Sequence, residues 1–342
     1  MRVLHVISEM GAGGAEALVA GMALAGGDVG WESAVASGGG FRADALRAAG
    51  VPVFDVPVAR RSALGVLRAT WAVRATVRRF RPDVVLAHNV SASLVARLAS
   101  PRRPVVTVFH GVASADVPGA VRVLRRVSTV VVTVASAAAQ RLSGLDSVVV
   151  IPNAAFPSVP SADRATVRAR LGTPLDVPVA LCPARLEPQK RHDVLLDAWA
   201  QIPGDAELWL AGDGSLRSAL ESSAPGRVRF LGTRTDVRDL LEAADVTVLT
   251  SDWEGMPIAL LESLAAGRPI VASDVDGVRE VLSGGGGVLV PRRNPSQTAK
   301  ALRGLLYSPT ARSVAAAHDG SADAHTLMKS YDELLRTVLE GR

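Results

Sequence analysis

The stretch VTVLTSDWEGMPIALLESLAAGRPIVAS, residues 246–273, contains a strand, a loop, a helix and a second strand in succession. Its two ends, 246–250 and 268–273, have the nearly continuous apolar composition of strands that are buried on both faces. Between them, Pro257 suits the first position of a helix and Gly267 suits its terminator. Two apolar strands joined by a helix predict a parallel βαβ unit, and therefore a parallel sheet covered by helices.

The same alternation of short Val-rich runs and helical stretches continues on the N-terminal side of this unit. The further strand candidates are residues 3–7, 33–37, 83–87, 104–109, 129–134, 178–183, 206–212 and 228–232. A Pro- and Ser-rich stretch after Ile151 interrupts the pattern, as an interdomain linker would. The 342 residues suffice for two domains of about 150 residues each. We therefore expect an α/β fold of two doubly wound, Rossmann-like domains that face each other across a cleft.

This pattern predicts four segments. Residues 1–157 form an N-terminal Rossmann-like domain, 158–177 a linker region, and 178–329 a C-terminal Rossmann-like domain. Residues 330–342 contain a final helix, which could belong to either domain.

The composition excludes several classes of protein. Cys182 is the single cysteine and lies in an apolar run, so we interpret it as a buried thiol, with neither a disulfide nor a Cys-based metal site. The N-terminus lacks the apolar core and cleavage site of a secretory signal, which predicts a cytoplasmic protein. The uncharged stretch 127–140 is shorter than the roughly 20 predominantly apolar residues needed to span a bilayer.

The positive charge is concentrated in the first half of the chain. Up to Pro157 there are 17 Arg, no Lys and 9 acidic residues, giving +8, whereas the remainder carries 21 basic and 24 acidic residues, giving −3. One helical segment contains seven of these arginines: Arg60, Arg61, Arg68, Arg74, Arg78, Arg79 and Arg81. The same segment contains four large apolar residues, which could occupy a separate face: Leu64, Leu67, Trp71 and Phe80.

This basic segment permits two interpretations. It is either a solvated surface helix or a docking site for anionic lipid or for a phosphate-bearing acceptor. We do not expect it to bind nucleic acid, because aromatic stacking residues are not interleaved with the charges.

Two glycine-containing loops follow predicted strands. The loop GAGGAE at 11–16, with Gly13 and Gly14, precedes a helix and could bring backbone N–H groups close to a phosphate. A tight strand-to-helix connection explains it equally well, because Glu16 stands where a dinucleotide fingerprint requires glycine. The second loop, with Gly212 and Asp213, is a turn at a strand end.

The loop RLEPQKR at 185–191 places two cations directly after a predicted strand. Fixed charges such as Arg185 and Lys190 can neutralise a departing diphosphate, which is a task of divalent metals in other enzymes. Ordinary solvated loop charges remain the alternative.

The stretch 254–262 contributes two carboxylates. Eight residues of continuous helix would turn Glu254 and Glu262 about 80° apart, so a shared target requires Glu254 to lie in the loop before the helix. The N–H groups of residues 255–258 would then face the same ligand as Glu254. Glu262 is an acid among apolar neighbours and needs a partner if buried; a ribose diol, an arginine or water would each serve.

Six ordered motifs together resemble one known family. They are GGAE at 13–16, TVFHG at 107–111, VIPN at 150–153, RLEPQK at 185–190, GDG at 212–214 and EGMPIALLE at 254–262. In this order, over nearly the whole chain, they resemble the retaining glycosyltransferases of family 4 with the GT-B fold. The most specific element is a Glu followed by seven residues and a second Glu.

The resemblance implies a function and a set of roles. A hexose would pass from a nucleotide diphosphate donor, such as a UDP-sugar, to a hydroxyl of a lipid-linked or polysaccharide precursor or of a small metabolite, without a metal or other cofactor. Glu254 would contact the donor sugar, Glu262 the ribose, and Arg185 with Lys190 the diphosphate. His110 would lie near the sugar on the N-terminal, acceptor-side domain; a hydrogen-bonded core histidine is the alternative. The remaining donor contacts would come from Gly13, Gly14, Gly212, Asp213, Gly255, Met256 and Pro257.

Two other functions remain open from the sequence. One is a sugar-nucleotide epimerase of related fold, and the other is a non-catalytic nucleotide-sugar-binding protein.

Several positions depart from the family pattern. Asp274 and Asp276 resemble a DxD metal motif, but they align with a loop that often contains paired glycines, so we do not interpret them as a metal site. Arg191 stands where glycine often follows the lysine, and Ala184 and Ala154 also replace common residues. In the family the last helix commonly crosses back to the N-terminal domain, which suggests the same for residues 330–342.

Overall fold

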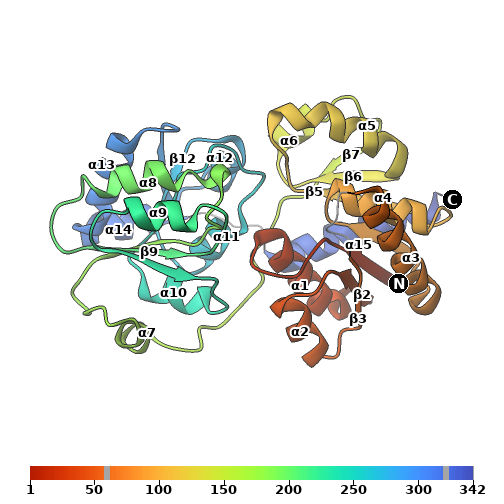
Figure 1. Cartoon of the computed structure of the whole chain (residues 1–342), viewed down its shortest axis with the longest axis horizontal. Coiled ribbons are helices and arrows are strands. Elements are labelled where there is room, and N and C mark those ends of the chain that lie inside the picture. Colours follow the sequence, from red (N-terminus) through yellow and green to blue (C-terminus); the bar gives the residue numbers. More distant parts are fainter. Residues whose placement is uncertain (58–61, 319–322, 342) are drawn as a thin grey trace. The chain divides into compact units, whose positions relative to one another are not determined.

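The computed structural model describes residues 1–57, 62–318 and 323–341 (Figure 1). The chain divides into two compact units: unit 1 is Met1–Ala154 with Ala322–Arg342, and unit 2 is Ala155–Ser321. Each unit is a parallel sheet with helices on both faces (Figure 1). The prediction of two doubly wound, Rossmann-like α/β domains is confirmed.

Unit 1 has the strand order β3-β2-β1-β4-β5-β6-β7. Its strands are β1 Arg2–Val6, β2 Glu32–Ser37, β3 Val53–Asp55, β4 Val84–Ala87, β5 Val105–Phe109, β6 Val130–Thr133 and β7 Val148–Val150. Its α-helices are α1 Gly14–Ala25, α2 Phe41–Ala48, α3 Ala63–Phe80, α4 Val90–Ala99, α5 Val117–Val127, α6 Ser136–Arg141 and α15 Ala324–Glu340. Two short 3-10 helices complete it: η1 Gly26–Val29 and η2 Ser114–Asp116.

Unit 2 has the strand order β10-β9-β8-β11-β12-β13. Its strands are β8 Val179–Cys182, β9 Glu207–Ala211, β10 Val228–Gly232, β11 Val246–Leu249, β12 Ile270–Ser273 and β13 Gly287–Val290. Its helices are α7 Arg164–Leu171, η3 Pro188–Lys190, α8 His192–Trp199, α9 Arg217–Ser223, α10 Val237–Ala243, α11 Ile258–Ala265, α12 Asp276–Val281, α13 Pro295–Leu306 and α14 Pro309–Ala316. In both sheets the chain reverses its direction of strand addition beside the first strand, between β1 and β4 and between β8 and β11. Ligands of doubly wound sheets bind outside the carboxyl ends of the strands at this point.

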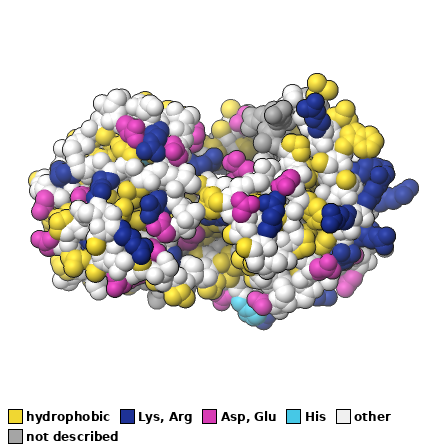
Figure 2. Space-filling view, turned by 60° about the horizontal axis from the view of Figure 1, so that its bottom comes forward, with side chains coloured by type: hydrophobic (Ala, Val, Ile, Leu, Met, Phe, Trp, Pro, Cys, Tyr) yellow, Lys and Arg dark blue, Asp and Glu magenta, His cyan; other side chains and the backbone are white. Residues whose placement is uncertain are grey.

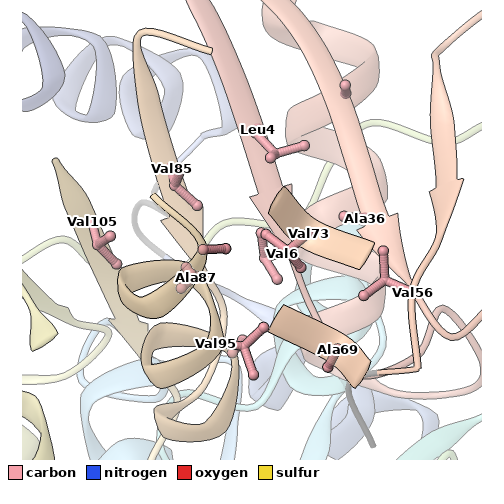
Figure 3. Packing of buried hydrophobic residues seen from close by; sticks show 14 of the residues in the cluster. Leu4, Val6, Ala36, Val56, Ala69, Val73, Val85, Ala87, Val95 and Val105 are labelled. Carbon is pink, nitrogen blue, oxygen red and sulfur yellow. The ribbon is translucent and has the colours of Figure 1, made fainter. Parts of the chain in front are cut away.

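The core of unit 1 is built from small and β-branched side chains (Figure 3). Leu4 and Val6 on β1 and Val85 on β4 face Val73 of α3 and Val95 of α4, and all five are at most 2% exposed. Burying a side chain of this size stabilises a fold by about 1.5–3 kcal/mol. The Val-rich runs seen in the sequence are therefore the inner layer of the unit.

The segment 158–177, expected to be a linker, is partly helical and belongs to unit 2. Val167 of α7 packs into the core of that unit, and Arg168 is fully buried. The boundary between the units falls after Ala154 instead of Pro157. The Pro- and Ser-rich stretch indicated where the chain leaves unit 1. Helix α7 was not predicted because its composition is polar, although its arginines bind buried carbonyl groups and a carboxylate.

Arg168 is held by an ion pair at the base of the sheet of unit 2. Its Nη2 lies 2.9 Å from Oδ2 of Asp245, and Arg164 binds Oδ1 of the same carboxylate at 3.0 Å. The Asp245 carboxylate also accepts the N–H of Val179 at 2.8 Å. Burial lowers the pKa of Arg168, but Asp245 and the nearby carbonyl groups keep the guanidinium charged.

We predict that Asp245→Ala lowers the free energy of unfolding of unit 2 by about 3–5 kcal/mol, because it leaves a buried arginine without its counterion. Urea denaturation followed by tryptophan fluorescence measures the loss. Asp44→Ala is the matched control, because Asp44 also pairs with an arginine, Arg47, but is exposed. Equal stability of the two variants would contradict the prediction.

The final helix α15 begins at Ala324, before the expected position near residue 330, and belongs to unit 1. Asp323 caps it by accepting the N–H of Thr326 at 2.6 Å. Its buried side chains are Leu327, Met328, Tyr331 and Leu335. Asp332 accepts a hydrogen bond from Nε1 of Trp31 at 2.8 Å, which fixes the helix beside η1.

Across residues 1–57, 62–318 and 323–341, none of the helices combines the length and the apolar character that crossing a bilayer requires.

Candidate functional site

The loops that follow β8 and β11 are joined to each other at the carboxyl edge of the sheet in unit 2. The side chain of Gln189 donates to the carbonyl of Trp253 at 2.7 Å, and the N–H of Asp252 donates to the carbonyl of Gln189 at 2.9 Å. Oγ1 of Thr250 donates to the carbonyls of Lys190 and Arg191, both at 3.1 Å. Both loops therefore form one framework at the point where a ligand is expected.

Lys190 and Glu254 meet within this framework. Nζ of Lys190 lies 2.6 Å from Oε1 of Glu254, and Oγ of Ser251 donates to the same oxygen at 2.6 Å. The side chain of Glu254 is 7% exposed and that of Lys190 is 16% exposed. The sequence suggested both residues as ligand contacts, and the structure brings them into direct contact.

Arg185, the other expected cation, follows β8 and is exposed. In the described part of the chain, its guanidinium has no ion pair or hydrogen bond. The charge of Arg185 is therefore available to an anion, unlike those of its loop neighbours.

Arg191 adopts a left-handed backbone conformation with φ of 51°, which explains why glycine is common at this position in the family. Its guanidinium binds Asp193 at 2.6 Å and Asp252 at 3.3 Å. Arg293 makes two hydrogen bonds of 2.7 Å to Asp252 and so lowers the pKa of that carboxyl. These ion pairs secure the loop in a conformation that arginine rarely adopts.

Glycines bring the loops after β8 and β9 close together. A Cβ atom at Gly212 would lie 2.0 Å from the carbonyl oxygen of Ala184, and one at Gly214 would lie 2.5 Å from that of Leu186. The carbonyl of Asp213 accepts the N–H of Leu186 at 3.0 Å, and its carboxylate pairs with Arg217 at 3.1 Å. Gly212 and Asp213 therefore support the Arg185 loop.

Helix α11 begins one residue later than expected, at Ile258, with Pro257 at its N-cap. Glu254, Gly255 and Met256 lie in the loop before it, as predicted, and Gly267 follows its end with φ of 64°. Glu262 lies within the helix and is half-buried. No side chain caps the first turn of this helix in the described structure.

Gly277 at the start of α12 packs directly against the Glu254 loop. A Cβ atom there would lie 1.3 Å from the carbonyl oxygen of Gly255. Neighbouring Asp274 and Asp276 lie 2.8 Å and 3.7 Å from the guanidinium of Arg279. Considering residues 1–57, 62–318 and 323–341, no three His, Cys, Asp or Glu side chains gather as possible metal ligands.

We predict that Gly277→Ala raises the donor KM between about fivefold and 100-fold, because a methyl group forced into this contact costs about 1–3 kcal/mol. Initial rates at varied donor concentration measure the change. Gly304→Ala is the matched control, because a Cβ atom at Gly304 meets nothing within 4 Å. A donor KM equal to that of the control would contradict the prediction.

Gly13, Gly14 and His110 belong to unit 1. Gly13 is the N-cap of α1, and a Cβ atom there would lie 2.0 Å from Oε2 of Glu16, so this carboxylate lies at the helix N-terminus where a phosphate was expected. His110 follows β5 and is half-buried, although its Nε2 is buried without a hydrogen-bond partner in the described structure. Burial lowers the pKa of His110 to about 4.

Three residues of the site were not singled out in the sequence. Ser251 binds Glu254, while Gln189 and Asp252 join the two loops. Ser251 and Asp252 lie within the stretch that predicted the βαβ unit, but no spacing rule distinguishes them from ordinary polar loop residues.

Two Rossmann-like units with a charged loop framework at a strand-reversal point define a protein of the doubly wound α/β class, whose ligands bind at that point of the sheet. Two family profiles match the chain: "Glycosyl transferase 4-like domain" over residues 2–154 and "Glycosyl transferases group 1" over residues 177–308. The chain belongs to the family 4 glycosyltransferases with the GT-B fold.

Two curated relatives match only part of the chain. The lipopolysaccharide core biosynthesis glycosyltransferase LpsE of Rhizobium meliloti (strain 1021) is 35% identical over 151 residues, 42% of this chain and 44% of that protein. The GDP-mannose-dependent alpha-(1-6)-phosphatidylinositol dimannoside mannosyltransferase of Mycobacterium tuberculosis (strain ATCC 25177 / H37Ra) is 34% identical over 152 residues, 42% of this chain and 39% of that protein. The matched region thus spans less than half the length of each relative.

Among solved structures, that of Anabaena Alr3699/HepE in complex with UDP and glucose has the same fold. It covers 98% of this chain and 100% of its own, with a TM-score of 0.85 and 23% sequence identity.

Proposed function

We propose that this chain is a retaining, metal-independent hexosyltransferase that takes its sugar from a nucleotide diphosphate donor, a UDP-sugar, and transfers it to a hydroxyl acceptor. The observation that carries the proposal is the contact between Lys190 and Glu254 at the strand-reversal point of unit 2. A cation and a carboxylate at this position match the two parts of the donor, its diphosphate and its sugar hydroxyls.

The loop cations account for the departure of the nucleotide. Negative charge grows on the diphosphate as its bond to the sugar breaks, and fixed cations stabilise that charge without a metal. Lys190 is held in place by Glu254, whereas Arg185 is exposed and unpaired among the described residues. The uncapped N–H groups in the first turn of α11 would add donors for the phosphates.

Glu254 and Glu262 would recognise the rest of the donor. Both hydrogen bonds to Glu254 end on Oε1, so Oε2 can accept a sugar hydroxyl. Glu262, which lies within α11, would accept hydrogen bonds from the ribose hydroxyls. On the acceptor side, His110, Gly13 and Gly14 of unit 1 would complete the contacts with the sugar and phosphate.

The choice of UDP is supported by the related fold that was solved with UDP and glucose. A relative named for GDP-mannose makes that donor the principal rival. We would incubate the protein with UDP-glucose, GDP-mannose and other sugar nucleotides, together with a panel of hydroxyl acceptors, with and without EDTA.

Transfer in EDTA with the donor's anomeric configuration kept in the product, as read by NMR, is the expected result. A strict metal requirement or an inverted product would overturn the corresponding part of the proposal. Conversion of the donor sugar without any acceptor would indicate an epimerase, and binding without turnover would indicate a non-catalytic protein.

We further propose that α3 contacts an anionic membrane surface, which would bring the enzyme to a lipid-linked acceptor. The described part of the basic segment is α3 with one residue on either side, 62–81; Arg60 and Arg61 lie outside the described residues. Leu64, Leu67 and Trp71 are 70%, 54% and 64% exposed. Arg68, Arg78 and Arg79 are exposed on the same helix, whereas Phe80 is buried.

The structure therefore corrects the expectation of separate charged and apolar faces, because the exposed face of α3 carries both kinds of residue. No acidic residue occurs between Asp55 and Asp83. Figure 2 shows Lys and Arg side chains gathered at the end of unit 1 where Figure 1 labels α3. Exposed Leu and Trp beside arginines suit the interface of an anionic bilayer.

Co-sedimentation with vesicles tests this contact. We expect binding to vesicles rich in phosphatidylglycerol but not to pure phosphatidylcholine, and loss of binding when Leu64, Leu67 and Trp71 are all changed to Ser. Val314→Ser, which removes an exposed apolar side chain from unit 2, is the control. Equal binding to both vesicle types would overturn the proposal.

A further inference from the structure

Three histidines form a diagonal row on one face of the sheet in unit 1. His5 on β1 is paired in register with Leu86 on β4, and Leu86 is paired with Val106 on β5. His88 is two residues beyond Leu86 and His110 is four residues beyond Val106, so all three side chains point to the same face. The row thus rises from the middle of the sheet to its carboxyl edge.

The rings of the row are in close succession. Nδ1 of His5 lies 3.1 Å from Nε2 of His88, with ring centroids 5.4 Å apart. The centroids of His88 and His110 are 6.0 Å apart, and these two rings are within 15° of parallel. His88 therefore has one neighbour that binds it and one against which it stacks.

Burial keeps the row uncharged. His5 and His88 are at most 1% exposed, and burial lowers the pKa of all three rings, to about 4 for His5 and His110. A neutral imidazole has one donor and one acceptor nitrogen. In the described structure, Nε2 of His110 is buried without a protein partner, so the orientation of the ring decides whether one of its nitrogens can reach a substrate.

The other end of the row is anchored in the fold. The ring of His5 lies 6.5 Å from that of Trp31, and the Trp31 indole donates to Asp332 of α15. Packing against Trp31 therefore holds the ring of His5 in place. His88 lies between His5 and His110 and contacts both.

We propose that His88 is a positioning residue: held by His5 and stacked on His110, it sets the ring orientation of His110 and thereby determines which nitrogen of that ring can reach a sugar hydroxyl. The inference rests on the proposed function, in which His110 faces the transferred sugar. It assigns His88 no contact with substrate.

His88→Phe tests the proposal, because phenylalanine keeps an aromatic ring but cannot hydrogen-bond to His5. We expect kcat to fall about 10–100-fold, as a misplaced catalytic contact would cause, with the donor KM changed less than about twofold because unit 2 binds the donor. His5→Phe, one ring further away, should cause a smaller loss in the same direction. His325→Phe changes an exposed histidine of α15 and is the control.

A spectroscopic readout separates positioning from activity. In ¹⁵N-labelled protein, the imidazole signals of His110, assigned with a His110→Phe sample, should shift in His88→Phe and in His5→Phe but not in His325→Phe. Unchanged His110 signals in both row variants would overturn the proposal, whether or not the wild type shows transfer. Absence of transfer from every donor would instead count against the proposed function.

Discussion

Replacing Glu254 with Gln is expected to reduce kcat for sugar transfer by about 100-fold to 1,000-fold, the range seen when one group that stabilises a transition state is removed. Glutamine preserves the size of the side chain but loses the negative charge that holds Lys190 at 2.6 Å and accepts from Ser251. Lys190 would then lose its fixed position, and a sugar hydroxyl would lose a charged acceptor. Initial rates at saturating donor measure the effect.

Glu242→Gln is the matched control for this variant. Glu242 also pairs with a basic residue, Arg238, but it is more exposed and lies on α10. Its kcat should equal that of the wild type. Full activity in Glu254→Gln, or an equal loss in both variants, would show that Glu254 does not contact the donor.

Replacing Lys190 with Met is expected to lower kcat by a similar factor, about 100-fold or more, because the leaving diphosphate loses the cation that neutralises it. Methionine keeps an unbranched apolar side chain only one heavy atom shorter than that of lysine, so little space is left unfilled. The same substitution leaves the mostly buried Glu254 without its counterion. Rates at varied donor concentration should show a larger change in kcat than in KM.

The Lys190→Met and Glu254→Gln variants should not be additive. Because the two side chains form one ion pair, the double variant should have nearly the same kcat as the less active of the two single variants. Lys300→Met, an exposed lysine of α13, is the control and should be fully active. Additive losses would mean that the two residues act separately.

The central strands of both sheets were predictable because buried parallel strands are continuous apolar runs. The strands that were not predicted are β3, β7 and β13, and each lies at the edge of its sheet. They are three or four residues long and only partly buried, so their apolar runs are too short to stand out. β10 also lies at an edge but was predicted, and it is five residues long, so short length combined with edge position is what separated the two groups.

The candidate site divides in a similar way. Glu254 was placed before its helix because Pro257 marks the helix start, and that expectation holds. The contact between Glu254 and Lys190 could not be inferred, because 64 residues separate them and only the pairing of β8 with β11 brings their loops together. The sequence showed that Arg191 departs from the family pattern, which often has glycine there. Its left-handed backbone and its two aspartate partners could be found only in the structure.

The placement of α15 bears on the order in which the protein matures. Residues 1–154 are synthesised before unit 2, but their partner helix, which Trp31 and Asp332 fasten to η1, is synthesised after it. Domains usually fold as they emerge, starting from the N-terminus. Unit 2, which is contiguous in sequence, can fold while unit 1 still exposes the surface around Trp31. We therefore expect unit 2 to complete its fold before unit 1, in the reverse order of their synthesis.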